Sequence, residues 1–173
     1  MRNIVEMKKT AIIYSFRSVK TAKAADKIAS LLGDEVAKVD AETITSEELV
    51  KYDNLILGVP TWFDGELPNY WDEFVPAIEE LDLQKKKVAI FGNGNQVDYP
   101  ENFGDAVGLM AEIMETQGAK IVGETSTDGY TFESSHAVKN GSFVGLILDF
   151  ENQHKLTEKR IAAWTESLKK SFA

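Results

Sequence analysis

The sequence predicts a single α/β domain in which helices cover both faces of a parallel β-sheet, a three-layer α/β/α sandwich. Short apolar segments of strand length alternate along the chain with longer segments whose apolar residues recur at helical spacing. One apolar segment, residues 55–59, leads into Pro60, which is typical of a strand buried on both faces of such a sheet. With 173 residues and no repeat or low-complexity linker, the chain fits one domain spanning 1–173.

The first half of the chain predicts three strands that alternate with three helices. We expect strands at residues 10–14, 35–39 and 55–59, and helices at 21–32, from 45 onward, and at 69–81. Gly33 suits the C-cap of the first helix, and Thr45 with Glu48 forms a capping box at the start of the second. Pro76 lies inside the third predicted helix, where it lacks a backbone N–H, so we expect a kink or a restart there.

The second half predicts two more strands, and the last of them is interrupted. We expect the fourth strand at 87–91, a helix from 103 to 118, and a final helix that Thr157 caps and that turns Ile161, Trp164 and Leu168 inward. Residues 120–125 and 143–148 both have strand character, but the polar segment between them is too long for a tight turn. We therefore interpret 126–142 as an insertion in a fifth strand at the sheet edge, and 1–8 as a short extension.

The composition excludes several classes of site and partner. Without Cys, the chain cannot form disulfides, thiolate metal sites or iron–sulfur clusters, and its two His residues are not spaced as metal ligands. A formal net charge of −9 disfavours nucleic acid and anionic membranes as partners. No apolar run is long enough to cross a bilayer, and no signal-peptide pattern is present. We expect a cytoplasmic monomer without a metal site.

The first loop, residues 15–21, joins the first strand to the amino terminus of the first helix. It carries the cations Arg17 and Lys20 and the hydroxyls of Ser18 and Thr21. Unpaired backbone N–H groups and the positive end of the helix dipole favour a phosphate at such a position. The alternative is an ordinary helix start with solvated charges, and the lack of Gly excludes a Walker-type loop.

The second loop, residues 60–68, and the third loop, residues 92–103, follow the third and fourth strands and each offer an aromatic side chain. In open α/β sheets, ligands bind beyond the carboxyl ends of the strands. Trp62 and Tyr99 would hold a flat conjugated ring between them, with backbone and amide groups at its polar edge. The alternative for Trp62 is that it only covers the end of the core. None of these loops supplies a nucleophile or a base positioned by a partner, so no catalytic residue is predicted.

Four stretches of the sequence resemble flavodoxins of the long-chain kind. They are Gly-Val-Pro-Thr-Trp-Phe-Asp-Gly-Glu-Leu-Pro at 58–68, Gly-Asn-Gly-Asn-Gln-Val-Asp-Tyr-Pro-Glu-Asn-Phe at 92–103, Asp-Gly-Tyr-Thr-Phe-Glu-Ser-Ser at 128–135, and Phe-Val-Gly-Leu-Ile-Leu-Asp-Phe-Glu-Asn-Gln at 143–153. The resemblance extends over nearly the whole chain from Lys9. It implies the flavodoxin-like fold, with strand order 2-1-3-4-5, and non-covalently bound flavin mononucleotide (FMN) as cofactor.

The resemblance also implies positions for the cofactor. Trp62 would lie on the inner face of the isoalloxazine ring and Tyr99 on its outer face, while Glu151 would lie near the ribityl chain. The expected cofactor-binding residues are Phe16, Arg17, Ser18, Val19, Lys20, Thr21, Pro60, Thr61, Trp62, Phe63, Asn93, Gly94, Asn95, Tyr99, Asn102, Phe103 and Glu151.

The first loop departs from the family pattern Thr/Ser-x-Thr-Gly-x-Thr. Ser18 and Thr21 match it, but Phe16 replaces a hydroxyl residue and Val19 replaces the glycine. Losing one hydroxyl hydrogen bond to a phosphate costs about 1.5–3 kcal/mol. If the glycine position needs a positive φ, Val19 adds strain of about 1–3 kcal/mol. Arg17 is a candidate to offset part of this loss with a charge-assisted bond.

The function implied by the resemblance is that of a low-potential one-electron carrier without substrate turnover of its own, which shuttles electrons between a reductase and acceptor proteins. FMN performs the redox step in such a protein, while the chain tunes the potential and docks partners. Acidic residues around the loops favour partners with basic docking surfaces. Two alternatives stay open: an FMN-dependent NAD(P)H:quinone reductase, which needs an open ring face, and an interaction module with weakened FMN binding.

Overall fold

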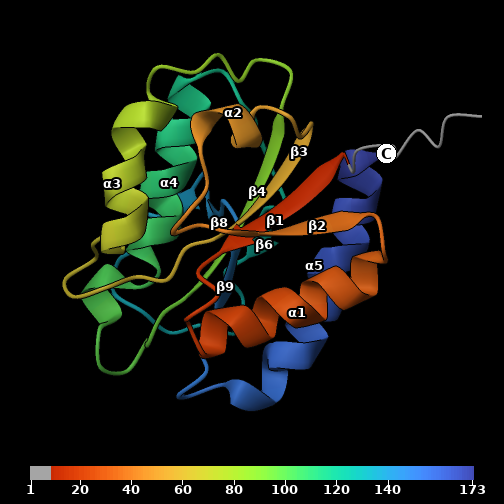
Figure 1. Cartoon of the computed structure of the whole chain (residues 1–173). Helices are drawn as coiled ribbons and strands as arrows, with labels where there is room; N and C mark the ends of the chain where they lie inside the picture. Colours follow the sequence, from red (N-terminus) through yellow and green to blue (C-terminus); the bar gives the residue numbers. More distant parts are fainter. Residues whose placement is uncertain (1–8) are drawn as a thin grey trace, which may run out of the picture.

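The computed structural model describes residues 9–173 and shows the three layers that the sequence predicts (Figure 1). Its main sheet is parallel and has the order β2-β1-β3-β4-β5, with β9 also paired to β4. The strands are β1 Thr10–Tyr14, β2 Val36–Asp40, β3 Asn54–Gly58, β4 Lys87–Asn93, β5 Lys120–Val122 and β9 Leu146–Leu148. The strand order 2-1-3-4-5 is therefore confirmed. The predicted extension, residues 1–8, lies outside the described residues.

Helices cover both faces of this sheet (Figure 1). Helices α1 Lys20–Leu32 and α5 Thr157–Phe172 lie on one face, while α2 Ser46–Leu49, α3 Asn69–Ile78 and α4 Asp105–Thr116 lie on the other. Because side chains alternate along a strand, β3 supplies both cores. Ile56 packs in the α1 and α5 core, and Leu55 and Leu57 pack in the α3 and α4 core. Short 3₁₀ turns lie at Pro100–Asn102 and His154–Leu156.

The fifth strand is interrupted, as predicted, but each half is shorter than predicted. Thr125 and Phe143, which we expected in the main sheet, pair with each other in a separate antiparallel sheet. That sheet consists of β6 Thr125–Ser126, β8 Ser142–Phe143 and β7 Val138–Lys139. The chain leaves β5 at Gly123, whose φ of +84° few other residues adopt, so the strand cannot continue. The insertion is thus partly β-structured.

Two helix ends differ from prediction. Helix α3 runs through Pro76 without a restart and ends at Ile78, and the N–H of Glu79 still donates to the carbonyl of Val75 at 2.9 Å. Thr157 does not cap α5, because it already has helical angles (φ −57°, ψ −51°) and its buried hydroxyl has no partner among the described residues. By contrast, Thr45 Oγ1 accepts the N–H of Glu48 at 3.3 Å, so the predicted start of α2 is confirmed.

Candidate functional site

A cavity of about 350 Å³ lies between the second and third loops, beyond the carboxyl ends of β3 and β4. We call it the ring pocket. It is lined by Thr61, Trp62, Phe63, Gly94, Asn95, Tyr99 and Asn102. All seven belong to the predicted cofactor-binding set, so the fold brings together residues that are far apart in sequence, as the parallel sheet requires.

The second loop forms a tight turn that presents Trp62 to the ring pocket. The backbone N–H of Trp62 donates to the carbonyl of Glu66 at 2.9 Å, and the carbonyl of Trp62 accepts the backbone N–H of Glu66 at 2.7 Å. Between them, Phe63 and Gly65 have φ values of +48° and +91°. The indole of Trp62 stands edge-on to Tyr70, with ring centroids 6.0 Å apart. The backbone of Trp62 is therefore fixed by the turn, whereas the side chain of Phe63, at the tip of the turn, is 74% exposed.

The third loop is held by a buried polar cluster that sequence reasoning missed. Asp149, which follows β9, is 1% exposed and accepts the backbone N–H of Gln96 at 3.1 Å and its side-chain Nε2 at 2.7 Å. Asn152 donates its backbone N–H to Asp149 at 3.0 Å and its Nδ2 to Asn95 Oδ1 at 2.8 Å. Burial raises the pKa of Asp149, but the hydrogen bonds from Gln96 and Asn152 outweigh it and leave the pKa below its usual value. A carboxylate directly after a buried strand was the available signal.

The amino terminus of α1 has backbone N–H groups that make no hydrogen bond within the described residues. Ser18 Oγ accepts the N–H of Ala22 at 3.1 Å and donates to the carbonyl of Ser15 at 2.6 Å. Within the described residues, the N–H groups of 19–21 have no acceptor. Three free donors at the positive end of a 13-residue helix fit a phosphate group.

Both cations of the first loop are bound to carboxylates from other segments. Arg17 makes a two-pronged contact with Glu42, which follows β2, through Nε at 2.9 Å and Nη2 at 2.6 Å. The hydrogen bond from Arg17 lowers the pKa of Glu42. Lys20 forms an ion pair with Glu151. Arg17 thus already has an acid partner in this structure.

Two residues that depart from the family pattern sit in the first loop without evident strain. Val19 has φ −94° and ψ −61°, so its backbone does not adopt the positive φ that would strain a valine. Its side chain is 81% exposed. Phe16 packs its ring against Tyr14, with centroids 5.1 Å apart, and remains half exposed. Phe16 thus fills the place of a hydroxyl residue with an aromatic contact.

Pro60 and Phe103, which are among the expected cofactor-binding residues, are not lining residues of the ring pocket. Both are buried: Pro60 follows the buried strand β3, and Phe103 stacks on Phe132 in the core. Phe103 also accounts for the glycine at position 94, since a Cβ on Gly94 would lie 2.8 Å from the ring of Phe103. Next to Gly94, the buried Oδ1 of Asn93 has no partner among the described residues, so it can accept a hydrogen bond from a ligand.

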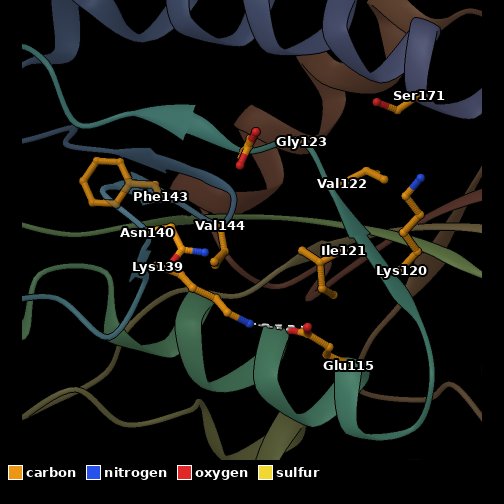
Figure 2. A pocket seen from close by; sticks show the side chains of 11 residues that line it. Glu115, Lys120, Ile121, Val122, Gly123, Lys139, Asn140, Phe143, Val144 and Ser171 are labelled. Carbon is orange, nitrogen blue, oxygen red and sulfur yellow. Dashed lines mark hydrogen bonds and ion pairs between the residues drawn. The ribbon is translucent and has the colours of Figure 1, made fainter.

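A second hollow, of about 440 Å³, runs along β5 and carries none of the predicted site residues (Figure 2). Its wall combines Ile121 and Val122 with Asn140 of the β7–β8 turn. Its charges are partly balanced, because Lys139 pairs with Glu115 at 3.2 Å. Among residues 9–173, no group of three potential metal ligands occurs and no helix could span a membrane. The ring pocket with the first loop is therefore the candidate site.

Comparison with known proteins gives a consistent result. A sequence model of the family described as flavodoxin matches residues 12–164. A flavodoxin from a Nostoc species is 40% identical over 166 residues, which cover 95% of this chain and 98% of the relative. Flavodoxin 1 from Escherichia coli is 42% identical over 161 residues, 92% of either chain. The crystal structure of Fusobacterium nucleatum flavodoxin bound to flavin mononucleotide is similar with a TM-score of 0.89 and 36% identity, covering 95% of this chain and 99% of that one.

Proposed function

The chain belongs to the flavodoxin family of FMN-based electron carriers, and we propose that it passes single electrons at low potential between a reductase and acceptor proteins. One observation carries this proposal: the ring pocket with Trp62 and Tyr99 lies at the same sheet edge as an α1 amino terminus with free N–H groups. The pocket suits a flat ring and the helix terminus suits a phosphate, which are the two ends of FMN. When bound, FMN would supply the redox chemistry.

The residues present fit FMN at each part of the site. Trp62 and Tyr99 would contact the ring, and Asn95 and Asn102 would lie at its edge. The free N–H groups of 19–21 would hold the phosphate, and the unpartnered Oδ1 of Asn93 is available to a hydroxyl donor. Thr61 positions the second loop, because its Oγ1 accepts the N–H of Ala106 at 3.1 Å.

The aromatic residues favour a carrier over a two-electron enzyme. Trp62 and Tyr99 come from different loops and line the same pocket, so a ring between them would have little open face for a hydride donor. Electron transfer needs only an accessible ring edge. We therefore infer that the chain has no substrate turnover of its own.

Acidic side chains around the ring pocket define the proposed docking surface. They are Asp64, Glu66, Asp72, Glu73, Asp98 and Glu101, and all six are exposed. Such a surface accelerates encounter with a basic partner, and salt screens the attraction over a Debye length of about 8 Å at physiological strength. We infer a cytoplasmic monomer whose reduction by a basic reductase slows as ionic strength rises. Rates independent of salt would count against this surface.

Spectroscopy of the purified full chain tests the function. We expect flavin absorbance bands near-stoichiometric with protein, with FMN fluorescence almost fully quenched, and two separate one-electron steps in a reductive titration. NADPH-driven quinone turnover without a reductase, together with a single two-electron step, would favour the quinone reductase. Absence of binding after added FMN would favour the interaction module.

A further inference from the structure

An ion pair joins the first loop to the segment that follows β9. Lys20, the first residue of α1, contacts Glu151, although the two are separated by 131 positions in the chain. Both side chains are about half exposed, at 51% and 40%. We propose that this pair, which we call the clasp, ties the phosphate end of the site to its ring end and slows FMN release. The proposal rests on the proposed function.

The residues on either side of Glu151 in the chain are hydrogen-bonded to the third loop, which forms part of the ring pocket. On one side, buried Asp149 holds Gln96 of the third loop. On the other side, Asn152 donates to Oδ1 of Asn95, a lining residue of the ring pocket, at 2.8 Å. Glu151 therefore cannot shift far without disturbing the third loop. An ion pair on Glu151 passes this restraint to the start of α1.

The clasp leaves Lys20 able to contact a phosphate. A lysine ammonium has three donors, and Glu151 takes one of them. The phosphate also has the free N–H groups of 19–21, so it does not need to displace Glu151. Arg17 differs, because Glu42 engages two of its nitrogens. Lys20 and Glu151 are thus positioning residues that hold two loops together around the ligand.

The competing interpretation is that Glu151 withholds Lys20 from the phosphate. Under that interpretation, removing the carboxylate would tighten FMN binding. The two interpretations predict opposite effects of Glu151→Gln, so one variant separates them. A half-exposed pair contributes little, so we expect release to accelerate only about two- to five-fold when the clasp is removed.

The experiment measures FMN dissociation from the full chain by the return of FMN fluorescence after dilution. Lys20→Gln and Glu151→Gln should each accelerate release, Lys20→Gln more so because it also removes a donor to the phosphate, and the double variant should be no faster than Lys20→Gln alone. The difference in release rate between the parent protein and these variants should become smaller in high salt, because salt screens the ion pair. The thermal midpoints of the FMN-free proteins should stay the same.

Lys139 and Glu115 provide a matched control. Their exposures, 59% and 52%, resemble those of the clasp, but they lie at the hollow of Figure 2. Lys139→Gln and Glu115→Gln should leave FMN release unchanged. Additive effects in the clasp double variant, or slower release from Glu151→Gln, would overturn the clasp alone. A parent protein that binds no FMN would instead overturn the proposed function and the clasp with it.

Discussion

Gly65 lies so close to Asp105 that a Cβ on Gly65 would come within 2.6 Å of Asp105 Oδ2. Gly65 also has a φ of +91°, in the region that favours glycine. The turn that carries Trp62 is thus seated on the amino terminus of α4, next to the contact between Thr61 and Ala106. One wall of the ring pocket depends on this fit.

Gly65→Ala should destabilise the fold and weaken FMN binding. The strained backbone and the collision with Asp105 should together cost about 1–3 kcal/mol in the free energy of unfolding, measured by urea denaturation. Gly141→Ala is the control, because Gly141 has a φ of +81° but nothing within 4 Å of its Cβ position. An equal loss in both variants would show that the contact with Asp105 contributes nothing.

Asp105→Asn should stabilise the protein at neutral pH and not in acid. Burial raises the pKa of Asp105, and the backbone N–H of His136, which donates to Oδ1 at 2.9 Å, offsets this only in part. The folded state therefore holds the proton more tightly than the unfolded chain, and stability falls as pH rises from about 4 through the raised pKa. Asparagine keeps an oxygen for His136 without the charge. Unfolding free energies at pH 3 to 7 should diverge with rising pH, and a constant difference would contradict the argument.

Trp62→Ala should weaken FMN binding and leave any bound FMN more fluorescent. Stacking contributes about 0.5–1.5 kcal/mol beyond the buried area, so a fluorescence titration should detect the loss. Val97→Ala is a suitable control, because Val97 is 66% exposed in the third loop but does not line the ring pocket. Unchanged affinity in the Trp62 variant would remove that residue from the site.

The layers of the fold could be predicted because they follow from local periodicity, whereas the supports of the site could not. The burial of β3 on both faces is visible in the sequence as the uninterrupted apolar run at 55–59. The pairing of Asp149 with Gln96 is not, since two polar residues 53 positions apart leave no periodic signal. The same holds for Arg17, whose charge predicted a phosphate contact and whose partner here is Glu42. The placement of Thr125 in the main sheet was wrong for another reason. Thr125 does form a strand, but the chain turns at Gly123, so that strand belongs to the separate antiparallel sheet.

Val19→Ala should tighten FMN binding by a few-fold and leave riboflavin unaffected. Val19 belongs to the segment whose N–H groups at 19–21 are free, and its branched side chain is exposed there; only FMN carries the phosphate that would approach this segment. Val19→Gly should gain no more than alanine, because the φ of −94° suits any residue and glycine loosens the chain. Titrations with both ligands decide this. A larger gain for glycine would mean that the bound loop needs a backbone conformation that valine resists.

Asp98→Lys should raise the potential at which the second electron enters. Asp98 is exposed beside the ring pocket, where its Oδ2 accepts Asn95 Nδ2 at 3.0 Å, and none of the seven lining residues is a cation. Fully reduced flavin tends to be an anion, and a carboxylate beside the ring pocket opposes that charge. Replacing the negative charge with a positive one should shift the second potential by roughly 20–60 mV. Asp98→Asn should give about half of this shift, since it removes one charge and keeps an acceptor.

Asp34→Lys makes the same charge change beyond the far end of α1 and should shift the potential little. Spectroelectrochemical titration of the three variants measures this, and equal shifts from Asp34→Lys and Asp98→Lys would attribute the effect to net charge instead of to the ring pocket.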